Sequence, residues 1–163
     1  QVDSVHTVVG SSNKRNLSYD DPQNDREAKF SMQYCLALGL MQDHLRIADF
    51  APEAVSRPEL RALIPRITMD AFPVERERAG ETPPDHEVTV RLKDGTVFET
   101  TRAHPRGTIH DPFDAADRAA KYADCIAGKL DDNDSAALAD LLTRFEAVND
   151  LDEVMRFLRF DLG

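Results

Sequence analysis

A short run near residue 30 combines side chains that could bind or protonate a small polar ligand. Lys29, Ser31, Gln33 and Tyr34 all lie within residues 25–37, a segment whose other side chains are largely apolar. In a helix, Lys29 would share a face with Gln33, and Ser31 would share one with Tyr34. A lysine in an apolar helix can pair with a carboxylate, and a tyrosine hydroxyl can donate to a developing oxyanion or act as an acid.

The same residues also fit a purely structural interpretation. Tyr34 can be a core aromatic residue whose hydroxyl reaches the rim, and Lys29 can extend its ammonium group to solvent. The residue pattern alone favours this interpretation over a ligand site. Both remain open at the level of the residues.

A second group of candidate residues surrounds a glycine in segment 103–112. This segment contains His104, Arg106, Gly107 and His110. Glycine lets the backbone approach an anionic ligand closely, while arginine and histidine can supply positive charge. A surface loop that needs glycine for its dihedral angles and proline for stiffness has the same composition. The two interpretations are equally compatible with the sequence.

Neither a metal site nor an organic cofactor is expected. The five histidines form no i,i+4 pair on a predicted helix and have no cysteine at ligand spacing. The acidic run 131–134 lacks the glycine and distal glutamate of a calcium loop, so it predicts the start of a helix. The chain contains no phosphate-binding loop, nucleophile elbow or dinucleotide fingerprint.

The elements that would position these residues follow from hydrophobic periodicity and turn signals. An Asp94-Gly95 turn between two alternating runs is typical of a β-hairpin. Strands are predicted over residues 2–9, 67–71, 87–93 and 96–100. Helices are predicted over residues 25–43, 58–63, 114–127, 131–145 and 150–158. We expect loops over 10–24 and 73–85, and an α+β fold in which helices pack on an antiparallel sheet.

Composition narrows the class of protein. With 163 residues, the chain has the length of about one domain. A net charge of -10 argues against a nucleic-acid partner.

Cys35 and Cys125 lie far apart in apolar helical contexts, which predicts two buried thiols in a reducing compartment. We see no signal peptide and no membrane-spanning run, so we expect a cytoplasmic protein without a membrane partner. Because the chain opens with Gln1, we expect a piece of a longer polypeptide.

Residues 25–37 resemble the helix that opens the C-terminal part of MmgE/PrpD-family proteins. The resemblance continues along almost the whole chain, through modest motifs in a specific order. These are Asp49-Phe50, the strand–Asp94-Gly95–strand hairpin, Arg106-Gly107-Thr108 with Asp111-Pro112, the 120–122 helix and the 149–152 turn. The family includes 2-methylcitrate dehydratase, cis-aconitate decarboxylase and iminodisuccinate epimerase.

The resemblance implies a fold and a partner. It implies that residues 1–163 are a single small α+β domain, similar to chorismate mutase in fold. This domain would accompany a large N-terminal helical domain of the same protein. Helices from about residue 134 to 163 would pack on that helical domain, and we expect a homo-oligomer such as a homodimer. The active site would lie between the domains and would need no metal or cofactor.

The resemblance also implies roles for individual residues. Tyr34 matches an active-site tyrosine of the decarboxylase branch, so it is the predicted catalytic residue. Lys29, Ser31 and Gln33 match positions near that site and are predicted to bind substrate. Arg106 and Gly107 match a glycine loop that faces the cleft. His104 lies beside this loop and is included among the substrate-binding residues as a branch-specific variant.

These expectations combine into one leading hypothesis. The chain would be the C-terminal domain of a lyase or isomerase that dehydrates, decarboxylates or epimerises small di- or tricarboxylates. Alone it would be inactive, because most acid/base residues of the family belong to the helical domain. Replacing Tyr34 with Phe in the full-length protein is expected to cut turnover with little loss of stability. The alternative is a non-catalytic binding or assembly module with the same fold; a true chorismate-mutase-like enzyme is weaker, because the arginine spacing shows no converging set.

Overall fold

The computed structural model of the chain describes residues 1–80, 82 and 84–159. Two compact units make up the chain: one comprises Gln1–Pro112, and the other begins at Phe113. That residues 1–163 form a single domain stays a prediction.

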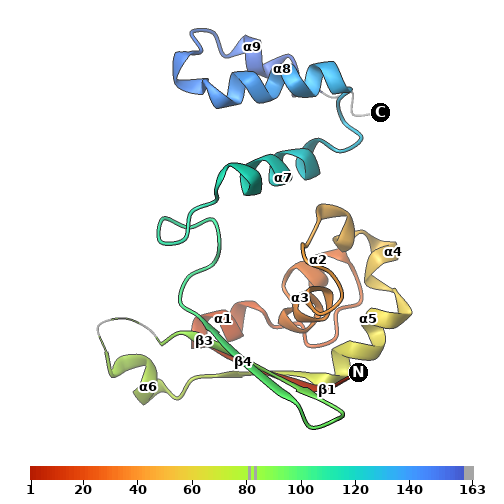
Figure 1. The fold of residues 1–163 in the computed structure, drawn as a ribbon, viewed down its shortest axis with the longest axis vertical. Helices are drawn as coiled ribbons and strands as arrows, with labels where there is room; N and C mark the ends of the chain where they lie inside the picture. Colours follow the sequence, from red (N-terminus) through yellow and green to blue (C-terminus); the bar gives the residue numbers. More distant parts are fainter. Residues whose placement is uncertain (81, 83, 160–163) are drawn as a thin grey trace. The chain divides into compact units, whose positions relative to one another are not determined.

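The first unit is built on a four-stranded sheet of order β2-β1-β3-β4 (Figure 1). The strands are β1 (Val2–Val9), β2 (Ile67–Ala71), β3 (His86–Leu92) and β4 (Val97–Arg102). Helices pack on this sheet, which confirms the predicted α+β class. The β1–β3 and β3–β4 pairs are antiparallel, whereas β1 and β2 are parallel. The parallel pair departs from the expected antiparallel sheet because β1 and β2 are joined by a long helical crossover instead of a hairpin.

The core of this unit lies between one face of the sheet and the helices of the crossover. Those helices are α1 (Ser11–Asn16), α2 (Asp25–Lys29), α3 (Met32–Gly39), α4 (Pro52–Val55) and α5 (Pro58–Leu63). Two 3₁₀ turns, Ile47–Phe50 and Ile64–Arg66, complete the crossover. The core contains Val5, Ala28, Tyr34, Ala37, Leu38, Val55, Leu60, Ile64 and Ile67. Tyr34 is therefore part of the main hydrophobic core.

The predicted single helix over residues 25–43 is wrong, because it divides at Ser31. Ser31 has extended backbone angles, and its hydroxyl oxygen accepts the N–H of Tyr34 at 3.1 Å. This bond makes Ser31 the N-cap of α3 and ends α2 before it. The exposed side chain of Phe30 also shows that the segment is not buried on all sides.

Two segments predicted as loops contain short helices. These are α1, in the 10–24 segment, and α6 (Val74–Arg78), in the 73–85 segment. Gly10 and Pro73 precede them with extended backbone angles. Helices of five or six residues have too few turns to produce an apolar periodicity, so turn-forming residues dominated the prediction.

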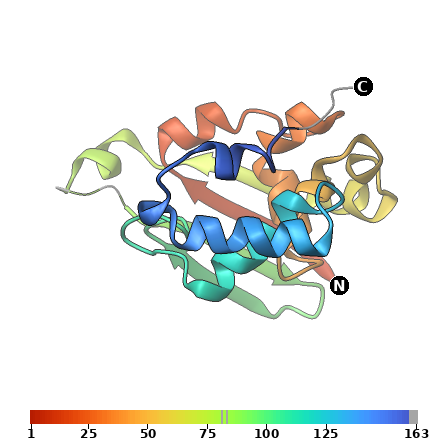
Figure 2. The same cartoon turned by 90° about the horizontal axis from the view of Figure 1, so that it is seen from above.

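Within its described residues, the second unit contains three α-helices and a small core. They are α7 (Ala115–Ile126), α8 (Asp132–Thr143) and α9 (Asp152–Met155), with a 3₁₀ turn at Phe145–Ala147. Helices α8 and α9 lie side by side (Figure 2). Their buried residues are Leu138, Leu141, Val154 and Phe157. Packing of residues 134–163 against a further domain stays a prediction.

The predicted starts of the first two helices of this unit are confirmed, whereas the helix predicted over 150–158 is shorter and begins at Asp152. The side chain of Asp114 caps α7 by accepting the N–H of Asp117, and Asp131 caps α8 through Asp134. One prediction here is wrong: Cys125 is exposed on α7, a helix none of whose residues is buried, whereas Cys35 is partly buried. Within the described residues, no helix is long and apolar enough to cross a bilayer.

Candidate functional site

Tyr34, the predicted catalytic residue, is completely buried in the first unit. Its hydroxyl donates to the backbone carbonyl oxygen of Asp49 at 2.5 Å, and its ring packs against Phe50 with 5.7 Å between ring centroids. Burial raises the pKa of the Tyr34 hydroxyl above its usual value, because the phenolate would lose its hydration. The hydroxyl is therefore a neutral hydrogen-bond donor whose partner in this structure is the protein backbone.

Asp49 connects the buried tyrosine to a polar pocket at the surface. Its carboxylate accepts from the Gln42 amide at 2.6 Å and from the backbone N–H of Arg46 at 2.8 Å. The guanidinium of Arg57 lies 3.5 Å from the other carboxylate oxygen. The pocket has a volume of about 300 Å³ and is lined by Gln42, Asp43, His44, Arg46 and Asp49. Its lining carries both signs of charge within reach of a small polar molecule.

Ser31 and Gln33 lie close to Tyr34 in the chain, at the start of α3, and both are buried. The Ser31 hydroxyl is used as the helix cap. The amide nitrogen of Gln33 donates to the Asp20 carboxylate at 2.7 Å, while its amide oxygen is buried with no hydrogen-bond partner among the described residues. A buried acceptor without a donor costs about 1–3 kcal/mol. This oxygen could therefore accept a hydrogen bond from a ligand.

Lys29 lies apart from these groups. It is the last residue of α2, and its exposed ammonium pairs with Asp25 at 3.1 Å. The ammonium lowers the pKa of the Asp25 carboxyl through this hydrogen bond. The expected sharing of one helix face by Lys29 and Gln33 is wrong, because the break at Ser31 places them in different helices. The role of Lys29 in binding substrate stays a prediction.

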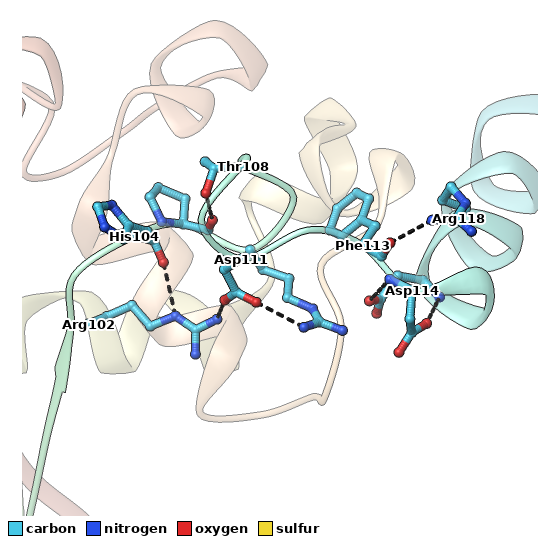
Figure 3. A network of polar contacts seen from close by, with 10 residues as sticks. Arg102, His104, Thr108, Asp111, Phe113, Asp114 and Arg118 are labelled. Atoms are coloured by element: carbon cyan, nitrogen blue, oxygen red, sulfur yellow. Dashed lines mark hydrogen bonds and ion pairs between the residues drawn. The ribbon is translucent and has the colours of Figure 1, made fainter.

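The second candidate group forms a loop after β4, which we call the arginine loop and define as residues 102–112. The carboxylate of Asp111 accepts hydrogen bonds from two guanidinium groups, those of Arg102 and Arg106 (Figure 3). The Arg106 contact measures 2.9 Å. One carboxylate thus holds two cationic side chains that lie four residues apart in the chain.

Two hydrogen bonds to backbone carbonyl groups hold the arginine loop in a tight turn. The N–H of Gly107 donates to the carbonyl oxygen of Asp111 at 2.7 Å, and the Thr108 hydroxyl donates to the Pro105 carbonyl at 2.9 Å. Gly107 has φ near 94°, a conformation that side-chain-bearing residues rarely adopt. The glycine is thus required for the turn that brings Arg106 back towards Asp111.

The two histidines of this loop stack on each other. The ring centroids of His104 and His110 are 4.3 Å apart with an interplanar angle of 24°. The carbonyl oxygen of His104 also accepts from Nε of Arg102 at 3.1 Å (Figure 3). All four side chains of Arg102, His104, Arg106 and His110 are exposed. The loop is therefore an exposed cluster of arginine and histidine side chains near the carboxylate of Asp111.

Apart from Lys29, the predicted residues thus fall into two groups within the first unit. Ser31, Gln33 and Tyr34 are packed at the start of α3, and His104, Arg106 and Gly107 belong to the arginine loop. Sequence reasoning missed Arg102 and Arg57, which carried no local signal. It quoted Asp49 and Asp111 within motifs but gave them no role, although an aspartate next to an Arg-Gly turn could have suggested an ion pair.

Comparison with known proteins identifies the family. Residues 1–146 match the model of the MmgE/PrpD C-terminal domain, so the chain belongs to this family.

Among curated proteins, the chain is similar to cis-aconitate decarboxylase of Mus musculus. The two are 23% identical over 143 residues, which cover 85% of this chain and 28% of the relative. The chain therefore spans about 28% of the length of the curated relative that it matches.

Proposed function

We propose that the chain is the C-terminal domain of a lyase or isomerase that acts on small di- or tricarboxylates. The reaction would be a decarboxylation, dehydration or epimerisation, each of which passes through an enolate-like or carbanionic state. Family membership and the similarity to a cis-aconitate decarboxylase support this class of reaction. The arginine loop is the single structural observation that carries the proposal.

The arginine loop supports binding of a carboxylate in two ways. Arg102 and Arg106 are both exposed and both contact the carboxylate of Asp111, so the loop brings two guanidinium groups close together. A guanidinium group presents donors in a planar fork that matches a carboxylate. Substrate carboxylate would bind along this loop, with Gly107 allowing close approach of the backbone and His104 beside it.

Groups near α3 would contribute at the reacting end of the substrate. Tyr34 is proposed as the acid or hydrogen-bond donor, and its neutral hydroxyl supports this role. The unpaired amide oxygen of Gln33 supports contact with a substrate hydroxyl or with a protonated carboxyl group. Lys29 and Ser31 are proposed to assist substrate binding. For Tyr34 to reach substrate, its hydroxyl must exchange the Asp49 carbonyl for the ligand.

The proposal includes a larger protein around this domain. An N-terminal helical domain would supply the remaining acid/base residues, so the 163-residue chain alone would bind carboxylate without turning it over. We propose a cytoplasmic, cofactor-independent enzyme that acts as a homo-oligomer.

A binding experiment on the chain tests the role of the loop. Cis-aconitate, citrate and methylcitrate would be titrated into isotope-labelled protein, with backbone amide shifts as the measurement. We expect shifts at residues 104–111, and at least a tenfold weaker dissociation constant for Arg106→Gln, about the value of one charge-assisted hydrogen bond. The matched control is Arg15→Gln, which removes an exposed arginine from α1. Equal weakening by both variants would indicate binding by net charge alone and would contradict a loop site.

A turnover assay on the longer parent protein tests the reaction. Cis-aconitate, citrate, methylcitrate and aspartate-derived imino acids would be supplied as substrates, and Tyr34→Phe would be compared with the unmodified protein. Turnover of one substrate that falls sharply in Tyr34→Phe would support both the reaction class and the catalytic tyrosine. Turnover that is unchanged in Tyr34→Phe would remove Tyr34 from the mechanism.

One observation favours the second candidate function, a non-catalytic binding or assembly module. Tyr34 is fully buried and its hydroxyl is already bonded to Asp49, which is the arrangement of a structural tyrosine. A folded parent protein that binds carboxylates but converts none of the panel would favour this module.

A further inference from the structure

The two histidines of the arginine loop form a stacked pair. Their ring centroids lie 4.3 Å apart, and the ring planes are inclined by 24°. A tight turn brings them together: the N–H of Thr108 donates to the Pro105 carbonyl, and the N–H of Asp111 donates to the Thr108 carbonyl. His104 and His110 therefore meet ring against ring, although residues 105–109 separate them in the chain.

A histidine elsewhere in the same unit has a different partner. On β1, Nε2 of His6 lies 2.9 Å from the carboxylate of Asp70, so its protonated form has an anion beside it. In the arginine loop the ring of His104 faces another imidazole instead. Two protonated imidazoles at this distance repel each other, and an anion that contacts both of them offsets the repulsion.

Three charged side chains of the loop surround the histidine pair. The guanidinium of Arg102 is tied to His104, because its Nε donates to the His104 carbonyl oxygen at 3.1 Å (Figure 3). Arg102 and Arg106 both contact the carboxylate of Asp111, the residue that follows His110. The guanidinium groups repel a protonated ring, and the carboxylate attracts it. A further carboxylate bound beside the pair would therefore favour its protonated form.

We propose that the stacked pair binds the second carboxylate of a di- or tricarboxylate and takes up one proton from water as it does so. This inference rests on the proposed function, in which Arg102 and Arg106 hold the first carboxylate. Histidine changes its charge between pH 5 and 8, so the pair can gain a positive charge and an N–H donor at neutral pH. The proton binds an imidazole nitrogen, no covalent bond to the ligand forms, and the proton returns to water when the ligand leaves.

The pair would distinguish dicarboxylates from monocarboxylates through pH. A monocarboxylate would be held by guanidinium groups, which stay charged throughout the neutral range, so its affinity should change little with pH. A dicarboxylate should bind more tightly as the pH falls, because its second carboxylate then meets protonated histidine. Uptake of one proton changes the dissociation constant by up to about tenfold per pH unit.

Calorimetric titration of the 163-residue chain with fumarate measures this linkage. Fumarate stays a dianion between pH 6 and 8, so its own protonation does not contribute. Titrations at pH 7 in Tris and in HEPES buffer, whose ionisation enthalpies differ, give the number of protons taken up. We expect roughly 0.3–1 proton for each fumarate bound, and on the order of tenfold tighter binding at pH 6 than at pH 8. Acetate, with one carboxylate, should show neither effect.

Substitution of the histidines assigns the proton. His110→Gln and His104→Gln keep a hydrogen-bond donor but cannot be protonated at neutral pH, so each should reduce the proton uptake and the pH dependence for fumarate. His6→Gln is the matched control, because it removes an exposed histidine of the same unit, and it should leave both unchanged. Circular dichroism checks that all three variants are folded.

The possible outcomes separate this inference from the proposed function. Backbone amide shifts at residues 104–111 without proton uptake, or uptake that persists in both loop variants, would overturn the histidine subsite and leave the arginine site in place. Equal loss of uptake in His6→Gln would overturn it as well. If neither fumarate nor acetate shifts these amides, the proposed carboxylate site itself fails, and the subsite fails with it.

Discussion

The residues at the start of α3 and the arginine loop belong to the same unit, but different forces hold them. Ser31, Gln33 and Tyr34 are buried, and their side chains bond to the protein, although the amide oxygen of Gln33 has no partner among the described residues. In the arginine loop the side chains of Arg102 and Arg106 are exposed and are held by the charge of Asp111.

Because of this difference, substitutions in the two regions should change different quantities. A buried hydrogen bond that is broken leaves a group without water, so its loss lowers the free energy of unfolding. Exposed ion pairs contribute little to folding, because water and salt replace them. Changes near α3 should therefore act mainly on stability, and changes in the arginine loop mainly on ligand affinity.

The largest expected effect is that of Tyr34→Phe. The structure revises the expectation of little stability loss, because the Asp49 carbonyl would lose its donor. We expect the free energy of unfolding to fall by about 1–3 kcal/mol in urea denaturation. Tyr19→Phe is the matched control, since Tyr19 is partly exposed, and it should change stability little. Equal stability of both variants would show that the Tyr34 bond is not structural.

Ser31→Ala should have the next largest effect, about 1 kcal/mol, because it removes the cap of α3 and leaves the Tyr34 N–H unpaired. Asn24→Ala removes the cap of α2 at an exposed position, where water can replace the side chain. Thermal or urea unfolding should therefore show a smaller loss for Asn24→Ala. The reverse order would indicate that burial does not govern these caps.

Cys35 on α3 predicts a pH dependence. Burial raises the pKa of its thiol, so the folded chain holds this proton more tightly than the unfolded chain does. The resulting stability is present below the unfolded thiol pKa of about 8.5 and is lost as pH rises through the folded pKa.

The measurement is the free energy of unfolding between pH 7 and 10. Relative to the unmodified chain, Cys35→Ser should remove part of the decline, which is at most about 1.4 kcal/mol per pH unit for one group. Cys125→Ser, at an exposed position, should leave the decline unchanged. A decline that persists in Cys35→Ser would exclude Cys35 as its source.

The smallest effect on stability is expected for Asp111→Asn, less than about 1 kcal/mol, although it removes a carboxylate that contacts two arginines. Backbone amides of residues 104–110 should nevertheless exchange hydrogen faster, because the loop loses its central contact. Asp85→Asn, at an exposed position of the same unit, is the control. A stability loss larger than that of Tyr34→Phe would contradict the division between the two regions.

Local signals predicted much of the fold. The Asp94-Gly95 turn places Gly95 at positive φ, as the hairpin requires, and Asp114 and Asp131 cap the helices that follow them. Each of these features depends on residues within about four positions of one another. The break at Ser31 is equally local, but the apolar residues around it outweighed the capping signal in the prediction.

The candidate site was predicted less completely. Tyr34 and Arg106 were selected from their residue types and from the family resemblance, whereas the contacts that define their surroundings were not. Asp49 lies 15 residues after Tyr34, so nothing in the spacing indicates that its carbonyl would meet the hydroxyl. Arg102 was missed because it ends a strand, and its ion pair with Asp111 depends on how the loop turns at Gly107.

By itself the sequence determined the α+β class, the hairpin, the helix caps and the family, because these follow from short-range spacing of residue types. Only the tertiary structure decided that β1 and β2 pair in parallel, that Tyr34 bonds to the backbone in the core, and that one carboxylate holds two arginines. The first two contacts join residues that are distant in the chain, and the third depends on the backbone conformation of a single glycine. Packing, and not local preference, fixes their geometry.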